Sequence, residues 1–307
     1  MSLPARVAAA ACQAPSPRGW PQAAPVYPPQ DRGRRHVSRR VIHTPRPDRS
    51  VVPRSVGRGP VGSRAPDRGA MEPLVLVVPA SGGLGASTFA AVLARQVSGV
   101  LVDGDVEGAG VDATLVLEEE PGLRWPDLAG LEGPAEPRHL LARLPGSAPP
   151  VLAGAGPTRV RSAVVGSALA ALRAQRPVVV DLPVPVLDRH DWLAWADLVV
   201  LLVGLRPRQV RDAEVTLRRV RDGAATVRLV TRGARRAEPV GREVADHLGG
   251  AWLGHLEDEP GVLRDEGRGR PPRSRGAVGR VARSVADVLP PATADEGGEP
   301  RWLRAAG

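Results

Sequence analysis

Lysine is absent from this chain of 307 residues, so all 42 of its basic side chains are arginines. The absence excludes every mechanism that needs a lysine amine, including the ordinary lysine of a phosphate-binding loop, a Schiff-base lysine and a tyrosine–lysine hydride-transfer pair. Cys12 is the only cysteine, which excludes an internal disulfide and a cysteine metal cluster. A single cysteine is typical of a reducing compartment.

Long apolar runs and aromatic residues are also scarce. No run approaches the roughly 20 residues that a membrane-spanning helix needs, so we expect a cytoplasmic protein. Phe, Trp and Tyr together make up 3% of the chain, so a core must be built from Val, Leu and Ala. The Val/Leu runs that are present are typical of buried strands in a parallel sheet.

Positive charge is concentrated in the first 70 residues, which hold 13 arginines, three aspartates and 12 prolines. The other 237 residues are nearly neutral, with 29 basic and 30 acidic side chains. The proline content and the lack of periodicity predict a disordered tail over residues 1–70. A basic arm for nucleic acid or anionic lipid is the functional alternative. Met71 directly precedes the first apolar run, so a misassigned start is a third interpretation.

Apolar runs alternate with helical patterns from residue 73 onward. Strands are expected at residues 74–78, 100–102, 151–152, 177–180, 198–203, 227–231 and 251–253. Helices are expected at residues 89–97, 126–144 (one or two), 160–173, 208–221, 240–248 and 275–289. This order predicts an α/β domain over residues 71–290, with a mostly parallel sheet covered by helices on both faces, and a polar tail at 291–307.

A glycine-rich turn joins the first expected strand to the first expected helix. It consists of Ser81, Gly82, Gly83, Leu84, Gly85, Ala86, Ser87 and Thr88. Glycines let main-chain amides wrap closely around an anion, and a helix N-terminus adds a favourable dipole. A hydroxyl at Ser87 or Thr88 stands where a magnesium ligand is expected. The turn predicts a phosphate site, and a tight turn without a ligand is the structural alternative.

Carboxylates follow two of the later strands. Asp103 and Asp105 come after the second strand, and Asp181 ends the run at 177–180. Ligands of open α/β sheets bind beyond the carboxyl ends of the strands, where carboxylates suit magnesium binding or the positioning of an attacking water. Each carboxylate alone is more often a solvated strand end. Their order after the turn makes Ser87, Asp103 and Asp181 candidate metal ligands and Asp105 the candidate catalytic residue.

The same stretches resemble the MinD/ParA family of P-loop ATPases. Residues 81–88 resemble its deviant Walker A motif, Lys-Gly-Gly-x-Gly-Lys-Thr/Ser-Thr, residues 102–105 its second motif, and residues 178–183 its Walker B motif. Residues 197–213 are similar to the region after Walker B. The string P-G-L-R-W-P-D-L at residues 121–128 resembles the CpaE-like subgroup of actinobacterial septum site-determining proteins. The resemblance covers about residues 73–290 and implies ATP or ADP with Mg²⁺ as cofactors.

The departures from the family motif concern its charges. Ser81 stands where the signature lysine would reach a dimer partner's nucleotide, and Ala86 where the ordinary lysine would contact the β- and γ-phosphates. Loss of one such charge costs several kcal/mol of transition-state stabilisation, roughly a hundredfold or more in rate. We therefore expect weak or absent hydrolysis, with Arg206 or Arg208 as a candidate replacement cation. At residues 230–232 the chain reads Val-Thr-Arg where the family often places an adenine-contacting asparagine.

The resemblance implies a nucleotide-responsive homodimer that acts in septum-site determination or in positioning a secretion or pilus apparatus. Its partners would be proteins of the division or secretion machinery, with peripheral attachment at the inner membrane face as an option. The arginine-rich helix at 208–221 could hold non-specific DNA, but a solvated helix is favoured. The final helix carries an apolar stripe that could meet a membrane, although packing on the sheet is favoured. The stripe consists of Val278, Val281, Ala282, Val285 and Val288.

Two other classes of protein fit part of the pattern. A ligand-free interaction scaffold would explain the lost lysines. A dinucleotide oxidoreductase is suggested by Gly83-x-Gly85 with an acidic residue about 20 positions further on. However, Thr88 occupies the place of the third glycine, and no lysine is available for a catalytic pair.

Overall fold

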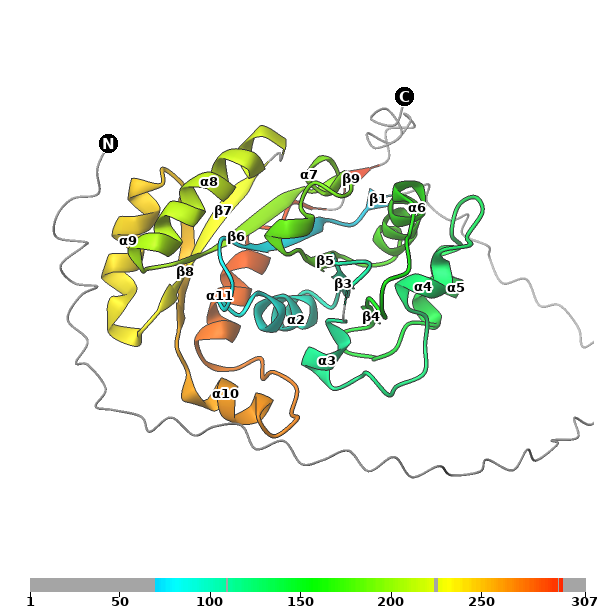
Figure 1. Ribbon diagram of the computed structural model, residues 1–307, viewed down its shortest axis with the longest axis horizontal. Coiled ribbons are helices and arrows are strands. Elements are labelled where there is room, and N and C mark those ends of the chain that lie inside the picture. Colours follow the sequence, from blue (N-terminus) through cyan, green and yellow to red (C-terminus); the bar gives the residue numbers. More distant parts are fainter. Residues whose placement is uncertain (1–69, 109, 224–225, 292, 295–307) are drawn as a thin grey trace, which may run out of the picture. The chain divides into compact units, whose positions relative to one another are not determined.

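The computed structural model describes residues 70–108, 110–223, 226–291 and 293–294. The predicted tails at 1–70 and 291–307 lie outside these residues, apart from Ala70, Pro291 and residues 293–294. Within the described part, the chain forms the α/β domain that the sequence predicts (Figure 1).

A seven-stranded sheet forms the centre of the domain. Its spatial order is β4-β3-β5-β2-β6-β7-β8, and every neighbouring pair of strands is parallel. The strands are β2 (Leu74–Pro79), β3 (Val100–Asp103), β4 (Val151–Leu152), β5 (Val178–Asp181), β6 (Leu198–Gly204), β7 (Val227–Gly233) and β8 (Ala251–Glu257). The predicted parallel sheet is confirmed.

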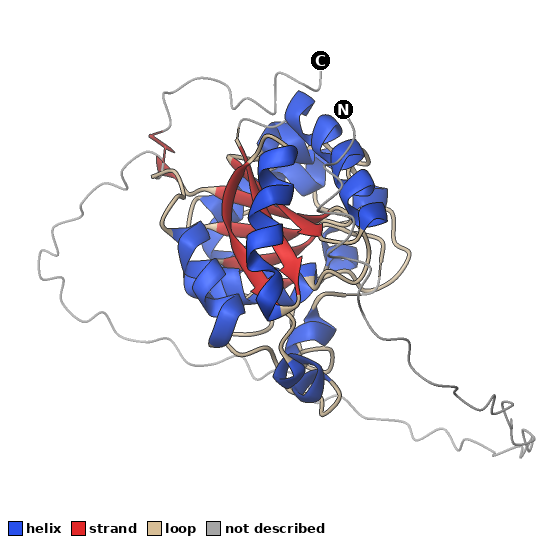
Figure 2. Cartoon of the chain, turned by 90° about the vertical axis from the view of Figure 1, so that its left-hand side faces the viewer, coloured by secondary structure: helices blue, strands red, loops and turns tan. Residues whose placement is uncertain are grey.

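Helices cover both faces of this sheet (Figure 2). One face packs against α2 (Ala86–Gln96) and α11 (Gly276–Ala286). The other face packs mainly against α6 (Ser162–Arg173), α8 (Pro207–Gly223) and α9 (Glu238–His247). The shorter helices are α3 (Asp112–Leu115), α4 (Trp125–Leu128), α5 (Pro137–Ala142), α7 (Trp192–Trp195) and α10 (Pro260–Glu266), with 3-10 turns η1 (Val184–Val186) and η2 (Arg235–Ala237).

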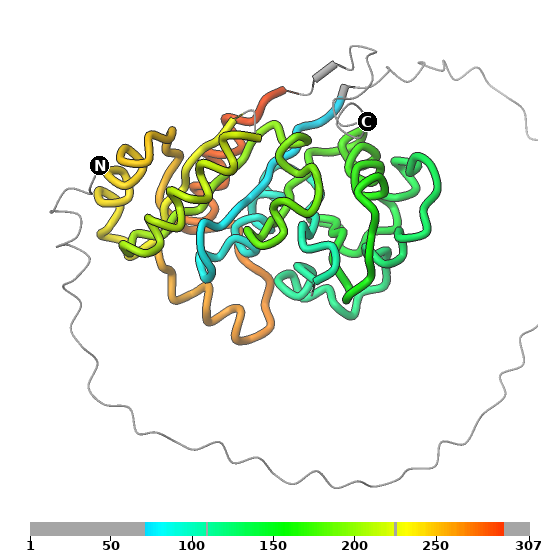
Figure 3. The backbone as a smooth tube through the Cα atoms, turned by 45° about the horizontal axis from the view of Figure 1, so that its top comes forward, coloured from blue at the N-terminus to red at the C-terminus, as the bar shows by residue number. Residues whose placement is uncertain are grey.

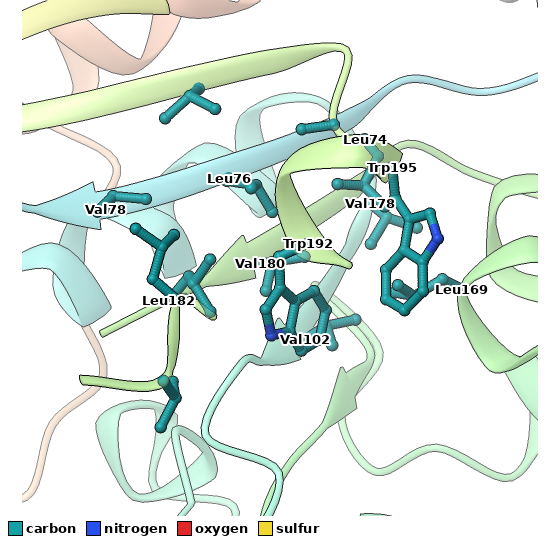
Figure 4. Close-up of a cluster of buried hydrophobic side chains, with 14 of the residues drawn as sticks. Leu74, Leu76, Val78, Val102, Leu169, Val178, Val180, Leu182, Trp192 and Trp195 are labelled. Carbon is teal, nitrogen blue, oxygen red and sulfur yellow. The ribbon is translucent and has the colours of Figure 1, made fainter. Parts of the chain in front are cut away.

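The two-sided burial follows from the two-residue period of a strand, which sends successive side chains to opposite faces. In β2, Leu74, Leu76 and Val78 enter one core cluster, whereas Val75 and Val77 enter the other. Because both faces are buried, strands of this kind are apolar throughout. Figure 4 shows the first cluster, in which Trp192 and Trp195 pack edge to face with ring centroids 5.6 Å apart.

The structure corrects several predicted boundaries. Helix α2 begins at Ala86 rather than Phe89, so Ala86, Ser87 and Thr88 of the glycine turn form its first turn. The predicted helical stretch at 126–144 holds only the short helices α4 and α5. Strand β8 continues to Glu257, beyond the predicted Leu253.

The sequence interpretation also missed elements that depend on neighbours in space. Helix α10 lies between β8 and α11 in a stretch that shows no clear apolar period. The two-residue strand β1 (Ala70–Met71) pairs antiparallel with β9 (Thr293–Ala294). Among the described residues, none of the helices combines the length and apolarity that crossing a membrane requires.

Candidate functional site

The glycine turn leaves the carboxyl end of β2 and leads directly into α2. Gly83 and Gly85 adopt left-handed conformations, with φ of 76° and 73°, which L side chains rarely adopt. The Ala80 amide donates to the Leu202 carbonyl of β6 at 2.8 Å and anchors the start of the turn. No acidic residue occurs in the first turn of α2, so its free amides and positive dipole end are available to an anion.

A cavity of about 850 Å³ opens over this turn. Its walls come from the turn, from α3, from the end of β5 and from the segment between β8 and α11. All six turn residues from Gly83 to Thr88 line it, whereas Ser81 and Gly82 do not. The side-chain hydroxyl of Ser81 is buried with no hydrogen-bond partner in the described part of the chain.

Asp181 ends β5 and lines the same cavity as the turn. The residue is 7% exposed, and its carboxyl lies beside the Ser87 hydroxyl on the cavity wall. Burial raises the pKa of the Asp181 carboxyl to about 6, against the lowering effect of the neighbouring Ser87 hydroxyl. The structure thus brings together two of the predicted magnesium ligands, a hydroxyl at the start of α2 and a carboxylate at a strand end.

Asp103 ends β3 directly beside Asp181 in the parallel register, but its carboxylate has other partners. One oxygen accepts from the Asp105 amide at 3.0 Å; the other accepts from the amides of Val111 at 3.0 Å and Gly154 at 3.3 Å. Burial raises the pKa of Asp103 to about 7, although these amides lower it. Asp103 is 4% exposed and does not line the cavity, so its magnesium role stays a prediction.

Residues 121–128, the string that suggested a CpaE-like subgroup, support the Asp103 end of the sheet. The Trp125 indole is fully buried and donates to the Asp103 carbonyl at 2.9 Å. The Arg124 guanidinium forms a buried ion pair with Asp112 at 2.9 Å and donates to the carbonyls of Gly122, Leu117 and Glu120. The arginine and tryptophan of this string therefore fix the loops around β3.

Asp105, the predicted catalytic residue, lies on the surface beyond β3. Its carboxylate approaches the Arg189 guanidinium at 3.7 Å, which also approaches Glu107 at 3.6 Å. Asp105 is not among the residues that line the cavity. Its catalytic role stays a prediction.

Arg232, at the carboxyl end of β7, is a cation at the turn that the sequence interpretation did not assign. Its Nη1 donates to the Leu84 carbonyl at 3.0 Å, and its Nε pairs with Asp258 at 3.1 Å. Arg206 and Arg208, the predicted replacements for the lost lysines, do not line the cavity, whereas Arg232 does. The position after a buried strand, which also marks Asp103 and Asp181, was the available signal.

The other two predicted surfaces, on α8 and α11, take part in internal contacts. In α8, Arg211 pairs with Glu214 at 2.8 Å and Arg221 donates to the Gly249 carbonyl at 2.6 Å. In α11, the apolar stripe from Val278 to Val285 is buried against α2 and the sheet, and only Val288 beyond the helix is exposed. The favoured prediction that this stripe packs on the sheet is confirmed.

The residues present fit part of a magnesium–triphosphate site. The left-handed glycines and the amides at the start of α2 suit phosphate oxygens, and the Ser87–Asp181 pair offers the oxygen ligands that magnesium prefers. The turn itself supplies no cationic side chain. The site therefore has the shape and the metal-side chemistry of a phosphate loop without the charge that such a loop normally carries.

Comparison with known proteins places this fold among P-loop ATPases. The chain superposes on the ParA family ATPase from Chlorobium tepidum TLS with a TM-score of 0.58 at 14% identity, over 71% of this chain and 98% of that protein. It superposes on the MinC:MinD cell division protein complex of Aquifex aeolicus with a TM-score of 0.57 at 17% identity, over 71% and 97% respectively. The chain has the MinD/ParA-type P-loop fold.

Sequence relatives extend the comparison. No family model matches the chain. The uncharacterized proteins MT3760 and Rv3660c from two strains of Mycobacterium tuberculosis are 33% identical to it over 241 residues. The match covers 74% of this chain and 66% of each relative, a little under two thirds of its length.

Proposed function

We propose that this protein binds a nucleoside triphosphate at the glycine turn and responds to it with weak or absent hydrolysis. The observation that carries the proposal is that the Ser87 hydroxyl and the buried Asp181 carboxyl lie together on the wall of the cavity over the turn. A hydroxyl at the start of α2 and a carboxylate at the end of a neighbouring strand are the protein groups that a phosphate-bound magnesium requires.

Each group would have a distinct task in this site. The main-chain amides between Gly83 and Thr88 hold phosphate oxygens, assisted by the dipole of α2. Ser87 and Asp181 hold the magnesium, which supplies positive charge to the phosphates when it is bound. Asp103 keeps the adjoining strand end in place through its three amide partners, and in the predicted role it would contribute to the magnesium site through water.

Hydrolysis would be slow because the turn lacks cations where negative charge develops in the transition state. Ser81 and Ala86 supply none, and Asp105, the candidate for positioning a water, lies outside the cavity lining. The protein would therefore act through nucleotide occupancy rather than through turnover.

The process we propose is septum-site determination or the positioning of a secretion or pilus apparatus by a CpaE/MinD-like homodimer. The string at residues 121–128 supports the subgroup, and the similarity to a MinD that forms a cell division complex with MinC supports a protein partner. A peripheral position at the inner membrane face is compatible with this role.

Calorimetric titration of the full chain with ATP and magnesium tests the proposal. We expect saturable binding, and at least a tenfold rise in Kd for Ser87→Ala. Ser284→Ala, on α11 and outside the cavity lining, serves as the matched control and should leave Kd unchanged. Light scattering in the presence and absence of the nucleotide would report dimerisation. Absence of binding at millimolar nucleotide would remove the switch from the proposal.

A ligand-free scaffold is the second candidate function, and one observation favours it. The guanidinium of Arg232 is already engaged by the Leu84 carbonyl and by Asp258, so the cation nearest to the turn serves internal contacts. This function predicts that ATP neither binds nor alters the oligomeric state. The same titration therefore decides between the two candidates.

A further inference from the structure

The cavity over the glycine turn has a second wall that is rich in arginine. This wall is the segment from Glu259 to Gly276, which includes α10 and leads from β8 into α11 (orange in Figure 3). Arg270, Arg273 and Arg275 of this segment line the same cavity as the turn residues Gly83 to Thr88. The turn without cations thus shares its cavity with three arginines, and Glu259, Asp265 and Glu266 of the same segment line the cavity too.

Two contacts fix this arginine segment to the rest of the domain, and a third braces it internally. The Arg95 guanidinium at the end of α2 donates to the Pro272 carbonyl at 2.8 Å. The Glu259 carboxylate accepts from the Ala277 amide in the first turn of α11 at 2.5 Å. Within the segment, the Arg273 guanidinium binds the buried Asp265 carboxylate through two contacts of 2.7 and 2.8 Å. The segment is therefore held against the same helix whose N-terminus forms the turn.

These contacts leave two arginines without an acidic partner. Arg273 is neutralised by Asp265, and Arg232 by Asp258. Arg270 and Arg275 form no ion pair with any residue that the structure describes, and both are exposed on the cavity side of their segment. Of the other acidic residues on this wall, Glu259 is engaged by the start of α11, and Glu266 forms no ion pair with a residue that the structure describes.

We propose that Arg270 and Arg275 supply the positive charge for the phosphate groups of the ligand at the glycine turn, in place of the lysines that the turn lacks. This inference rests on the proposed function of the cavity as a triphosphate site. Guanidinium groups bind phosphate oxygens with two parallel N–H donors and stay charged at all working pH values. With Arg270 and Arg275 on the same cavity as the free amides of α2, a polyanion would meet main-chain donors from the turn and guanidinium donors from the segment.

The test is titration of the full chain with Mg-ATP, Mg-ADP and inorganic tripolyphosphate. The double variant Arg270→Gln/Arg275→Gln removes both charges and leaves a shorter, polar side chain at each position. We expect its Kd for Mg-ATP to rise at least tenfold, with a smaller rise for Mg-ADP because fewer phosphate charges are affected. The control is Arg268→Gln, which removes an exposed arginine two residues away that does not line the cavity, and its Kd should stay within about twofold of the original.

The results separate this inference from the proposed function. If the unaltered protein binds Mg-ATP and the double variant binds it equally well, the inference is overturned and the triphosphate site stands. If the unaltered protein binds tripolyphosphate but not Mg-ATP, and the double variant loses that binding, the inference stands and the nucleotide proposal fails. If neither ligand binds, or if Arg268→Gln weakens binding as much as the double variant, the inference is overturned. Unfolding midpoints of all variants confirm that each is folded.

Discussion

Asp103 and Asp181 occupy paired positions at the ends of neighbouring strands, yet they face different partners. Both follow three buried aliphatic residues, both are almost fully buried, and burial raises the pKa of both. Asp103 is surrounded by main-chain amides, whereas Asp181 meets one hydroxyl and a cavity. The comparison shows that a buried strand-end carboxylate can either hold loops together or remain available for a ligand, according to the donors around it.

The largest expected change in the free energy of unfolding is at Asp103. Asp103→Ala removes the acceptor of three main-chain amides, two of which are buried. Because each unsatisfied buried donor costs about 1–3 kcal/mol, we expect the free energy of unfolding to fall by about 4 kcal/mol, measured by urea denaturation at about pH 5, below the raised pKa of Asp103, where no buried charge at this residue opposes folding. Asp105→Ala is the control: its carboxylate is on the surface and should cost less than about 1 kcal/mol. Equal effects of the two substitutions would contradict the structural role of Asp103.

At Asp181, a substitution that removes the charge is expected to raise the free energy of unfolding rather than to lower it. Its pKa rises from 3.8 in the unfolded chain to about 6 in the folded protein, so between these values the folded state holds a proton that the unfolded state releases. This contribution to stability is fully present below about pH 4 and is lost as the pH rises through about 6. Asp181→Asn cannot titrate and should therefore exceed the original protein in stability by up to about 3 kcal/mol at pH 8.

The measurement for Asp181 is the difference in unfolding free energy between the two proteins from pH 4 to pH 8, in buffer with a magnesium chelator. The difference should increase with rising pH, because only the original protein gains a buried charge, on Asp181. A difference that is constant, or that shrinks as the pH rises, would show that the carboxylate is better solvated than the cavity wall implies. The same variant should also lose magnesium-dependent nucleotide binding if Asp181 serves the proposed site.

The comparison also shows how far sequence reasoning reaches. The sheet and its order of elements were predictable because buried parallel strands are apolar throughout, as in residues 198–203. The division of roles between Asp103 and Asp181 was not predictable from the sequence, because two of the amides that bind Asp103 lie 8 and 51 residues further along the chain. Sequence spacing alone carries no information about which amides will converge on a strand end.

The arginine wall escaped prediction for a related physical reason. Helix α10 spans only seven residues, mixes apolar with charged side chains and has its proline at the first position, so no clear period marks it. Its location follows from anchors on α2 and α11 that are distant in sequence. The lost lysines were obvious from the sequence, whereas the cations facing the turn became visible only when β8 and α11 had been placed.

A smaller loss of stability is expected at Trp125, which contacts the Asp103 end of the sheet. Trp125→Phe removes the indole donor to the Asp103 carbonyl and leaves a small void in a fully buried position. We expect a loss of about 2 kcal/mol in the free energy of unfolding, from one missing hydrogen bond and imperfect packing. Affinity for Mg-ATP should stay within about twofold, because the indole does not line the cavity. A large loss of affinity without a loss of stability would mean that the two strand ends are coupled.

The smallest effect probes the backbone of the turn that faces Asp181. Gly83 has φ of 76° and Gly82 has an ordinary φ, but a methyl group at either position would meet open space. Gly83→Ala therefore isolates the cost of a left-handed alanine, about 1 kcal/mol in unfolding free energy, and Gly82→Ala should change stability by less than about 0.5 kcal/mol. If both substitutions are neutral, the turn is not held in this conformation, and the cradle of amides opposite Asp181 would have to be formed by the ligand itself. If only Gly83→Ala destabilises, the cradle exists before the ligand arrives, as the proposed site requires.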